Sequence, residues 1–145
     1  MYEAIVVGTD GSETATRGIS EATTLAGALG AQLHIVSAYE PVRGAKVAAP
    51  EGAAKVWAVR PDDEVRGIVE EAEAAVRRRG VAVKSHTLKG DPADALLKVA
   101  EQENADLIVV GSRGMHGVSR VLGSVPNKVS HQATCNVLIV ATEPS

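Results

Sequence analysis

The chain has 145 residues, a formal net charge of −3 and an aromatic content of 2%, with no phenylalanine. This charge gives no signal for binding polyanions, and the scarcity of aromatic side chains argues against a stacking surface for single-stranded nucleic acid. The N-terminus enters a strand pattern directly, and no apolar run reaches the length of a membrane span. We therefore expect one cytoplasmic domain over residues 1–145, with no nucleic-acid or membrane partner.

Apolar runs alternate with helical patterns along the chain. The first run, Ala4–Val7, ends in the turn cluster Gly8–Ser12, and Ser12 can cap the helix that follows. Pro61 and Pro92 mark the first turns of two later helices. The predicted strands are residues 4–7, 33–38, 81–88, 107–110 and 136–141, and the predicted helices begin near Ser12, Pro61, Pro92 and Ser124.

Five strands alternating with four helices predict a three-layer α/β fold, an open parallel sheet with helices on both faces. In such sheets the ligand crevice lies at the carboxyl ends of the strands. The loops after the first and fourth strands both carry residues suited to binding. If one ligand contacts both loops, these two strands must be neighbours in the sheet. Right-handed crossovers then give the strand order 3-2-1-4-5.

The stretch from Gly111 to Pro126 is the most informative part of the chain. It joins the buried strand 107–110 to a helix that we place from Ser124, because Pro126 is tolerated only in a first turn. Glycines and free first-turn amides can hold an anion. The alternative is two ordinary loops with a capping serine. A P-loop is excluded, because no lysine follows the last glycine.

Asp10 is the carboxylate that this arrangement places at the centre of the crevice. It could accept hydrogen bonds from ribose hydroxyls or contact a Mg²⁺ ion that bridges phosphates. The alternative is an Asx-turn residue that organises the loop. The backbone of Ala38 could meet an adenine edge, and Arg113 or Lys128 could add positive charge near phosphates.

Three other residues have structural interpretations that compete with functional ones. His34 lies inside the second predicted strand and is interpreted as a core-edge residue rather than a ligand. Cys135 is the single cysteine, which excludes an internal disulfide and favours a small, half-buried residue over a nucleophile. Trp57 lies in the aperiodic segment 39–60 and either anchors that segment or covers a ligand or partner.

With these residues in view, the chain resembles the single-domain universal stress proteins of bacteria and archaea. The resemblance covers nearly the whole chain, and four segments carry it: 7–12, 90–92, 105–114 and 122–126. ATP-binding members of that family have two glycines separated by two residues, then nine residues, then Gly and Ser or Thr. Here Gly111, Gly114, Gly123 and Ser124 match, but the interval holds eight residues.

The resemblance implies a regulatory ATP-binding module of the stress response, with Mg²⁺ as cofactor and at most slow ATPase activity. Asp10 would contact ribose or metal, and Gly8, Thr9 and Ala38 would surround adenine and ribose. The residues implied at the phosphates are Gly111, Arg113, Gly114, Gly123, Ser124 and Val125. Two alternatives stay open: a cyclic AMP binder, which the shortened interval could favour, and a dimeric interaction protein that needs no nucleotide.

The last predicted strand, Asn136 to Ala141, indicates a homodimer. An apolar strand at a sheet edge leaves backbone groups unpaired, and proteins usually cover or pair such edges. A two-fold contact between two copies of this strand is the simplest closure. The resemblance implies the same contact, because members of the family commonly dimerise through this strand.

Overall fold

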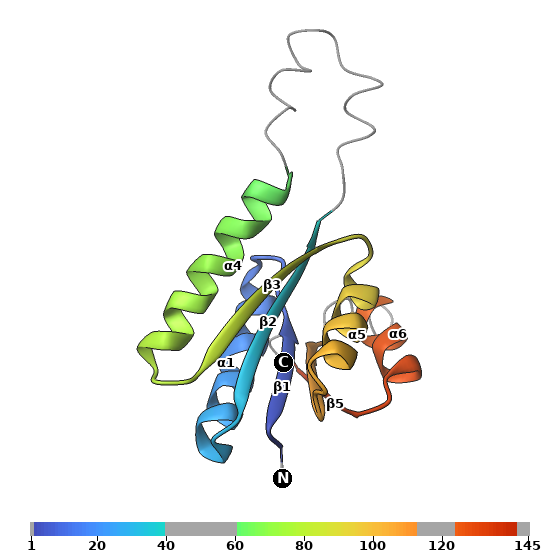
Figure 1. The fold of residues 1–145 in the computed structure, drawn as a ribbon. Coiled ribbons are helices and arrows are strands. Elements are labelled where there is room, and N and C mark those ends of the chain that lie inside the picture. The colour runs from blue at the N-terminus through green and yellow to red at the C-terminus, as the bar shows by residue number, and fades with distance from the viewer. Residues whose placement is uncertain (1, 40–60, 113–123, 142–145) are drawn as a thin grey trace, which may run out of the picture.

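A computed structural model, which describes residues 2–39, 61–112 and 124–141, shows a parallel sheet in the order β3-β2-β1-β4-β5 (Figure 1). The strands are β1 (Ala4–Gly8), β2 (Gln32–Tyr39), β3 (Val83–Lys89), β4 (Leu107–Gly111) and β5 (Asn136–Val140). The helices within these ranges are α1 (Glu13–Leu29), α4 (Pro61–Arg78), α5 (Pro92–Gln102) and α6 (Ser124–Gln132). The predicted fold class and strand order are confirmed.

Each predicted strand differs from the observed one by one or two residues at one end or both. Strand pairing explains the two places where the predicted strand is too long. β3 begins at Val83, which is the first residue in register with β2, so Val81 packs in the core but lies before the ladder. β5 ends at Val140, the last residue in register with β4, so Ala141 lies outside the strand.

The helix starts follow the capping residues in the sequence. The Ser12 hydroxyl accepts a hydrogen bond from the Ala15 amide at 3.2 Å and caps α1. The Asp91 carboxylate accepts one from the Asp94 amide at 3.0 Å and caps α5, in which Pro92 occupies the first turn. These caps fix the two helices that flank the carboxyl end of β1.

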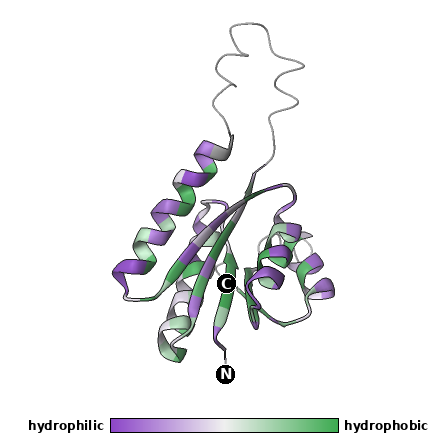
Figure 2. Ribbon diagram, in the orientation of Figure 1, coloured by the Kyte–Doolittle hydropathy of each residue, from purple (hydrophilic) through white to green (hydrophobic). Residues whose placement is uncertain are grey.

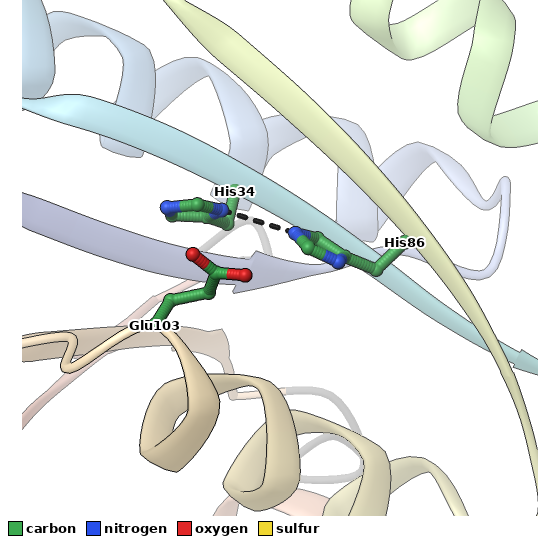
Figure 3. Close-up of side chains that lie close together, drawn as sticks. All are labelled: His34, His86 and Glu103. Atoms are coloured by element: carbon green, nitrogen blue, oxygen red, sulfur yellow. Dashed lines mark hydrogen bonds between the residues drawn. The ribbon is translucent and has the colours of Figure 1, made fainter.

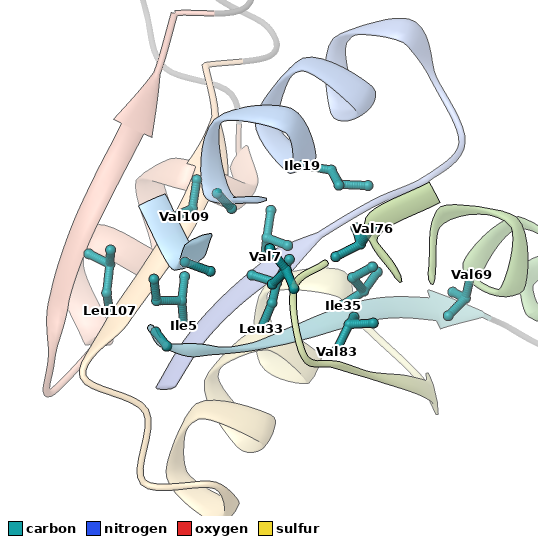
Figure 4. Close-up of a cluster of buried hydrophobic side chains, with 14 residues drawn as sticks. Ile5, Val7, Ile19, Leu33, Ile35, Val69, Val76, Val83, Leu107 and Val109 are labelled. Atoms are coloured by element: carbon teal, nitrogen blue, oxygen red, sulfur yellow. The ribbon is translucent and has the colours of Figure 1, made fainter. Parts of the chain in front are cut away.

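The sheet is buried on both faces by separate apolar clusters. Ile5 and Val7 of β1 belong to the cluster under α1 and α4 (Figure 4). Val6 belongs to the cluster on the other face, under α5 and α6. Figure 2 shows hydrophobic residues along the central strands and hydrophilic residues on the outer sides of the helices. Because both faces are covered, the central strands are continuous apolar runs rather than alternating ones.

The two edges of the sheet are β3 and β5. Leu138 of β5 is 37% exposed, and it stands out among the large apolar side chains of the described residues, most of which are buried. Within the described ranges, no helix combines the length and the apolar character needed to cross a membrane.

Candidate functional site

A cavity of about 420 Å³ opens at the carboxyl ends of β1, β2 and β4. It lies where the strand order changes direction, between β1 and β4, which is the position expected for a ligand in an open α/β sheet. The residues that line it are Gly8, Thr9, Asp10, Thr14, Ala15, Gly18, Val36, Ser37, Ala38, Pro92, Leu96, Val110, Gly111, Ser124, Val125 and Pro126. The cavity is therefore built mainly from small and apolar residues.

The loop after β1 forms one wall of the cavity. The Thr9 amide donates to the carbonyl oxygen of Val36 at 2.9 Å, which extends the β1–β2 pairing to the cavity edge. The Thr9 hydroxyl accepts from the Gly11 amide at 3.0 Å, and the Asp10 carboxylate accepts from the Ser12 amide at 2.9 Å. Asp10 thus closes an Asx turn, as one of the sequence interpretations predicted, while also lining the cavity.

Ser37 is a polar residue of this wall that sequence reasoning missed. Its side chain is buried, and its hydroxyl donates to the carbonyl oxygen of Thr9 at 2.6 Å. The bond holds the end of β2 against the loop after β1, beside Ala38. A serine within an otherwise apolar strand was the sequence feature that could have indicated this role for Ser37.

The opposite wall comes from the end of β4 and the start of α6. Gly111, Ser124 and Val125 line the cavity together with the β1 loop, so residues more than a hundred positions apart face one space. Amides in the first turn of a helix have no acceptor within the helix and attract negative charge. Three further predicted site residues, Arg113, Gly114 and Gly123, lie outside the described residues.

Helices α1 and α5 close the cavity from the sides, a role that the sequence pattern of neither helix predicted. A Cβ at Gly8 would lie 3.2 Å from Leu96 Cδ2, so the glycine allows α5 to approach the end of β1. A Cβ at Gly18 would meet only the Gly111 amide nitrogen, at 4.0 Å, so Gly18 leaves space open beside β4. Gly18, a glycine inside a helical pattern, was the sequence feature that could have indicated the α1 wall.

Among the described residues that line the cavity, Asp10 alone carries a formal charge. Lys128, considered above as a phosphate partner, instead pairs with two acids at the start of α5. Its Nζ lies 2.8 Å from Asp94 Oδ1 and 3.5 Å from Asp91 Oδ2. The hydrogen bond to Asp94 is the main reason that the pKa of Lys128 is raised.

The other residues singled out in the sequence lie away from the cavity. Cys135 is half-buried just before β5, as predicted, and burial raises the pKa of its thiol, which disfavours the nucleophilic thiolate. His34 is 3% exposed in β2. Trp57 and most of the segment 39–60 lie outside the described residues.

The model of the universal stress protein family matches residues 1–141. A universal stress protein of Mycobacterium tuberculosis is 40% identical over 147 residues, covering 97% of each chain. One from Thermus aquaticus is 37% identical, covering 97% of this chain and 99% of its own.

Solved structures show the same fold. The crystal structure of a universal stress protein in complex with cAMP is 33% identical, covers 98% of each chain and superposes with a TM-score of 0.74. A universal stress family protein from Burkholderia pseudomallei is 28% identical, covers 96% of each chain and has a TM-score of 0.69.

Proposed function

This chain belongs to the universal stress protein family, and on that premise we propose that it is a regulatory module that binds an adenine nucleotide. ATP with Mg²⁺ is the leading ligand. The nucleotide would change the order of the surrounding loops or the choice of protein partner, rather than serve as the substrate of a fast reaction. The family alone does not fix this function, so the proposal depends on the site.

The observation that carries the proposal is the convergence of two loops on one cavity. The loop after β1 and the start of α6 both face a space of about 420 Å³, which is within the usual range for small-molecule sites. Apolar walls suit a purine ring, and a helix N-terminus suits phosphate oxygens. A pair of merely structural loops would not need a shared cavity.

The described residues fit an adenine nucleotide in three ways. Gly8, Thr9 and Ala38 offer backbone groups and small side chains beside the apolar wall, where adenine and ribose would bind. The first turn of α6 offers the amides of Ser124 and Val125 to phosphate. The Asp10 carboxylate would accept from ribose hydroxyls or contact Mg²⁺. When bound, Mg²⁺ supplies positive charge that lets phosphates lie near a carboxylate.

We propose slow turnover at most. Rapid phosphoryl transfer needs a positioned base and charges that stabilise the transferring group. Asp10, the one charged residue among the described lining residues, is engaged with the Ser12 amide. The proposal predicts that ATP remains bound and largely intact over the time of a binding experiment.

Cyclic AMP is the second candidate ligand. A relative that is 33% identical was solved in complex with cAMP. The interval between Gly114 and Gly123 has eight residues, one fewer than the ATP-binding pattern, and a shorter segment could favour a single phosphate. Competition between the two nucleotides on one sample separates these candidates.

Calorimetric titration of the purified chain tests the proposal. We expect saturable binding of one ATP per chain with Mg²⁺ present, and little binding of GTP. Displacement of ATP by a lower concentration of cAMP would identify the cyclic nucleotide as the preferred ligand. Absence of saturable binding by either adenine nucleotide would contradict the proposed function.

We also propose that two copies pair through β5. Leu138 is 37% exposed at this edge of the sheet, and an unpaired apolar edge invites such pairing. Sedimentation analysis should find a dimer, which Leu138→Arg should convert to a monomer by placing charges at the contact. Ala74→Arg, at an exposed position of α4, is the matched control and should stay dimeric. A monomeric wild-type chain would contradict the pairing.

A further inference from the structure

Two histidines and a glutamate gather on the face of the sheet that α5 covers. His34 lies in β2 and His86 in β3, and the register pairs His86 with Val36, so the histidines are diagonal neighbours on one face. Glu103 follows the last turn of α5. Figure 3 shows the Glu103 carboxylate pointing toward the two imidazole rings. The three residues are far apart in sequence, and strand pairing and helix packing bring them together.

The atoms of this cluster have the spacing of a metal site. His34 Nδ1 and His86 Nε2 are 3.0 Å apart, and the ligand atoms of all three residues lie within 4.8 Å of one another. Two nitrogens bound to one tetrahedral Zn²⁺ ion are about 3.3 Å apart, given Zn–N bonds of about 2.0–2.1 Å. The two histidine nitrogens would need to move apart by only a few tenths of an ångström to bind one ion. The flexible Glu103 side chain can bring its carboxylate to the same ion.

We propose that His34, His86 and Glu103 bind a divalent transition-metal ion of the Zn²⁺ type. Two imidazoles and one carboxylate are a ligand set that such ions accept, with water in the fourth position. In the metal-free cluster, one of the two facing nitrogens must carry the proton of the hydrogen bond between them. The metal ion would take the place of that proton and bind both nitrogens.

The surroundings favour neutral imidazoles, the form that binds metal. Burial is the main cause that lowers the pKa of both His34 and His86, and each also feels the positive charge of Lys84. Glu103 acts in the opposite direction on both rings and would offset the charge of the ion. Since β3 is an edge strand and His86 and Glu103 are only partly buried, the ion can enter from solvent.

The proposed metal site is separate from the nucleotide cavity. None of its three residues lines that cavity, and His34 lies near the amino end of β2 whereas the cavity lies at the carboxyl ends. The bound ion would link the end of α5 to β2 and β3. The inference therefore goes beyond the proposed function and does not depend on nucleotide binding.

Titration of the full chain with Zn²⁺ after removal of metals by a chelator tests the proposal. We expect one Zn²⁺ per chain, and a loss of affinity of at least about tenfold in both Glu103→Gln and His86→Asn, by comparison with losses around known metal sites. Glu103→Gln keeps the size of the side chain, so folding is preserved. His131→Gln, at an exposed position of α6, is the matched control and should bind like the wild type.

A second readout distinguishes this cluster from metal binding elsewhere on the surface. Co²⁺ in the site should give the visible absorption of a four-coordinate ion, and Glu103→Gln should change that spectrum. Lys84→Gln removes a nearby positive charge and should tighten Zn²⁺ binding. Absence of stoichiometric binding, or equal affinity in the wild type, Glu103→Gln and His86→Asn, would overturn the proposal.

Discussion

The proposed nucleotide cavity and the His34–His86–Glu103 cluster are built in opposite ways. The cavity lies where strands end, and its walls are backbone groups and small residues such as Gly8, Gly18 and Ala38. The cluster lies on one face of the sheet, and its character comes from three polar side chains. Both depend on the same parallel register, which places the loops in one case and the imidazoles in the other.

This difference determines how each proposed site can be disrupted. A site built from backbone and empty space is sensitive to added volume, because a new side chain occupies the room meant for the ligand. A site built from metal-binding side-chain atoms is sensitive to the replacement of one such atom, as in Glu to Gln. It tolerates changes in the volume of nearby side chains. Selective variants can therefore remove either function and leave the other intact.

Filling the cavity should have the largest effect. Gly18→Leu places a helix-forming side chain where a Cβ has only the Gly111 amide nitrogen within reach. We expect ATP affinity to fall by more than about 100-fold, which is about 2.7 kcal/mol, with Zn²⁺ affinity unchanged. Calorimetry measures both.

The control for Gly18→Leu is the same exchange at Gly67, an exposed position of α4 where an added Cβ meets nothing within 4 Å. Gly67→Leu should bind ATP like the wild type. A folded Gly18→Leu variant with normal ATP affinity would show that the nucleotide does not use this cavity.

Metal removal should change stability rather than nucleotide affinity. At a free Zn²⁺ concentration 100 times its Kd, the ion should raise the free energy of unfolding by about 2.7 kcal/mol, less any binding to the unfolded chain. Urea unfolding with Zn²⁺ and with EDTA measures the difference. Glu103→Gln should lose most of it and Gly18→Leu should keep it. If Zn²⁺ stabilised the wild type and Glu103→Gln equally, the ion would bind at a site other than the His34–His86–Glu103 cluster.

Asp10→Asn should have a smaller effect on the nucleotide. The asparagine side-chain oxygen can still accept from the Ser12 amide, so the turn is kept while the negative charge is lost. We expect the affinity for ATP with Mg²⁺ to fall about tenfold, or about 1.4 kcal/mol. Titrations with and without Mg²⁺ measure the change. An unchanged affinity for ATP would mean that the Asp10 carboxylate closes the turn with the Ser12 amide but does not contact the nucleotide or Mg²⁺.

The smallest expected effect separates helix stability from cavity volume. Gly18→Ala adds one methyl group within α1, where the structure leaves room for it. The free energy of unfolding should rise by about 0.5–1 kcal/mol, because alanine favours the helix more than glycine does. Urea unfolding measures this. A loss of stability would mean that the space beside Gly111 is already filled.

The fold and two walls of the cavity, the loop after β1 and the start of α6, were predictable because their signals are local in sequence. Ser12, Pro61 and Pro92 mark helix starts, and the apolar runs between them mark buried strands. The strand order followed from the assumption that one ligand touches the loops after the first and fourth strands, and the structure confirms that order.

The rest could not be predicted because it depends on which side chains face each other after packing. The sequence pattern indicates only a core-edge role for His34, and the pairing of β2 with β3 is what shows that His86 lies beside it. The ion pairs of Lys128 depend on how α6 packs against α5. Gly18 and Leu96 line the cavity because of helix orientation, which the sequence pattern leaves open.

The most direct test of the central claim is a nuclear magnetic resonance titration of the labelled chain with ATP and Mg²⁺. We predict that the amide resonances of Gly8, Thr9, Gly111 and Ser124 shift together and saturate at one ATP per chain. The resonances of His34, His86 and Glu103 should stay in place. Shifts confined to residues away from the cavity, or no saturable shift at all, would contradict the account.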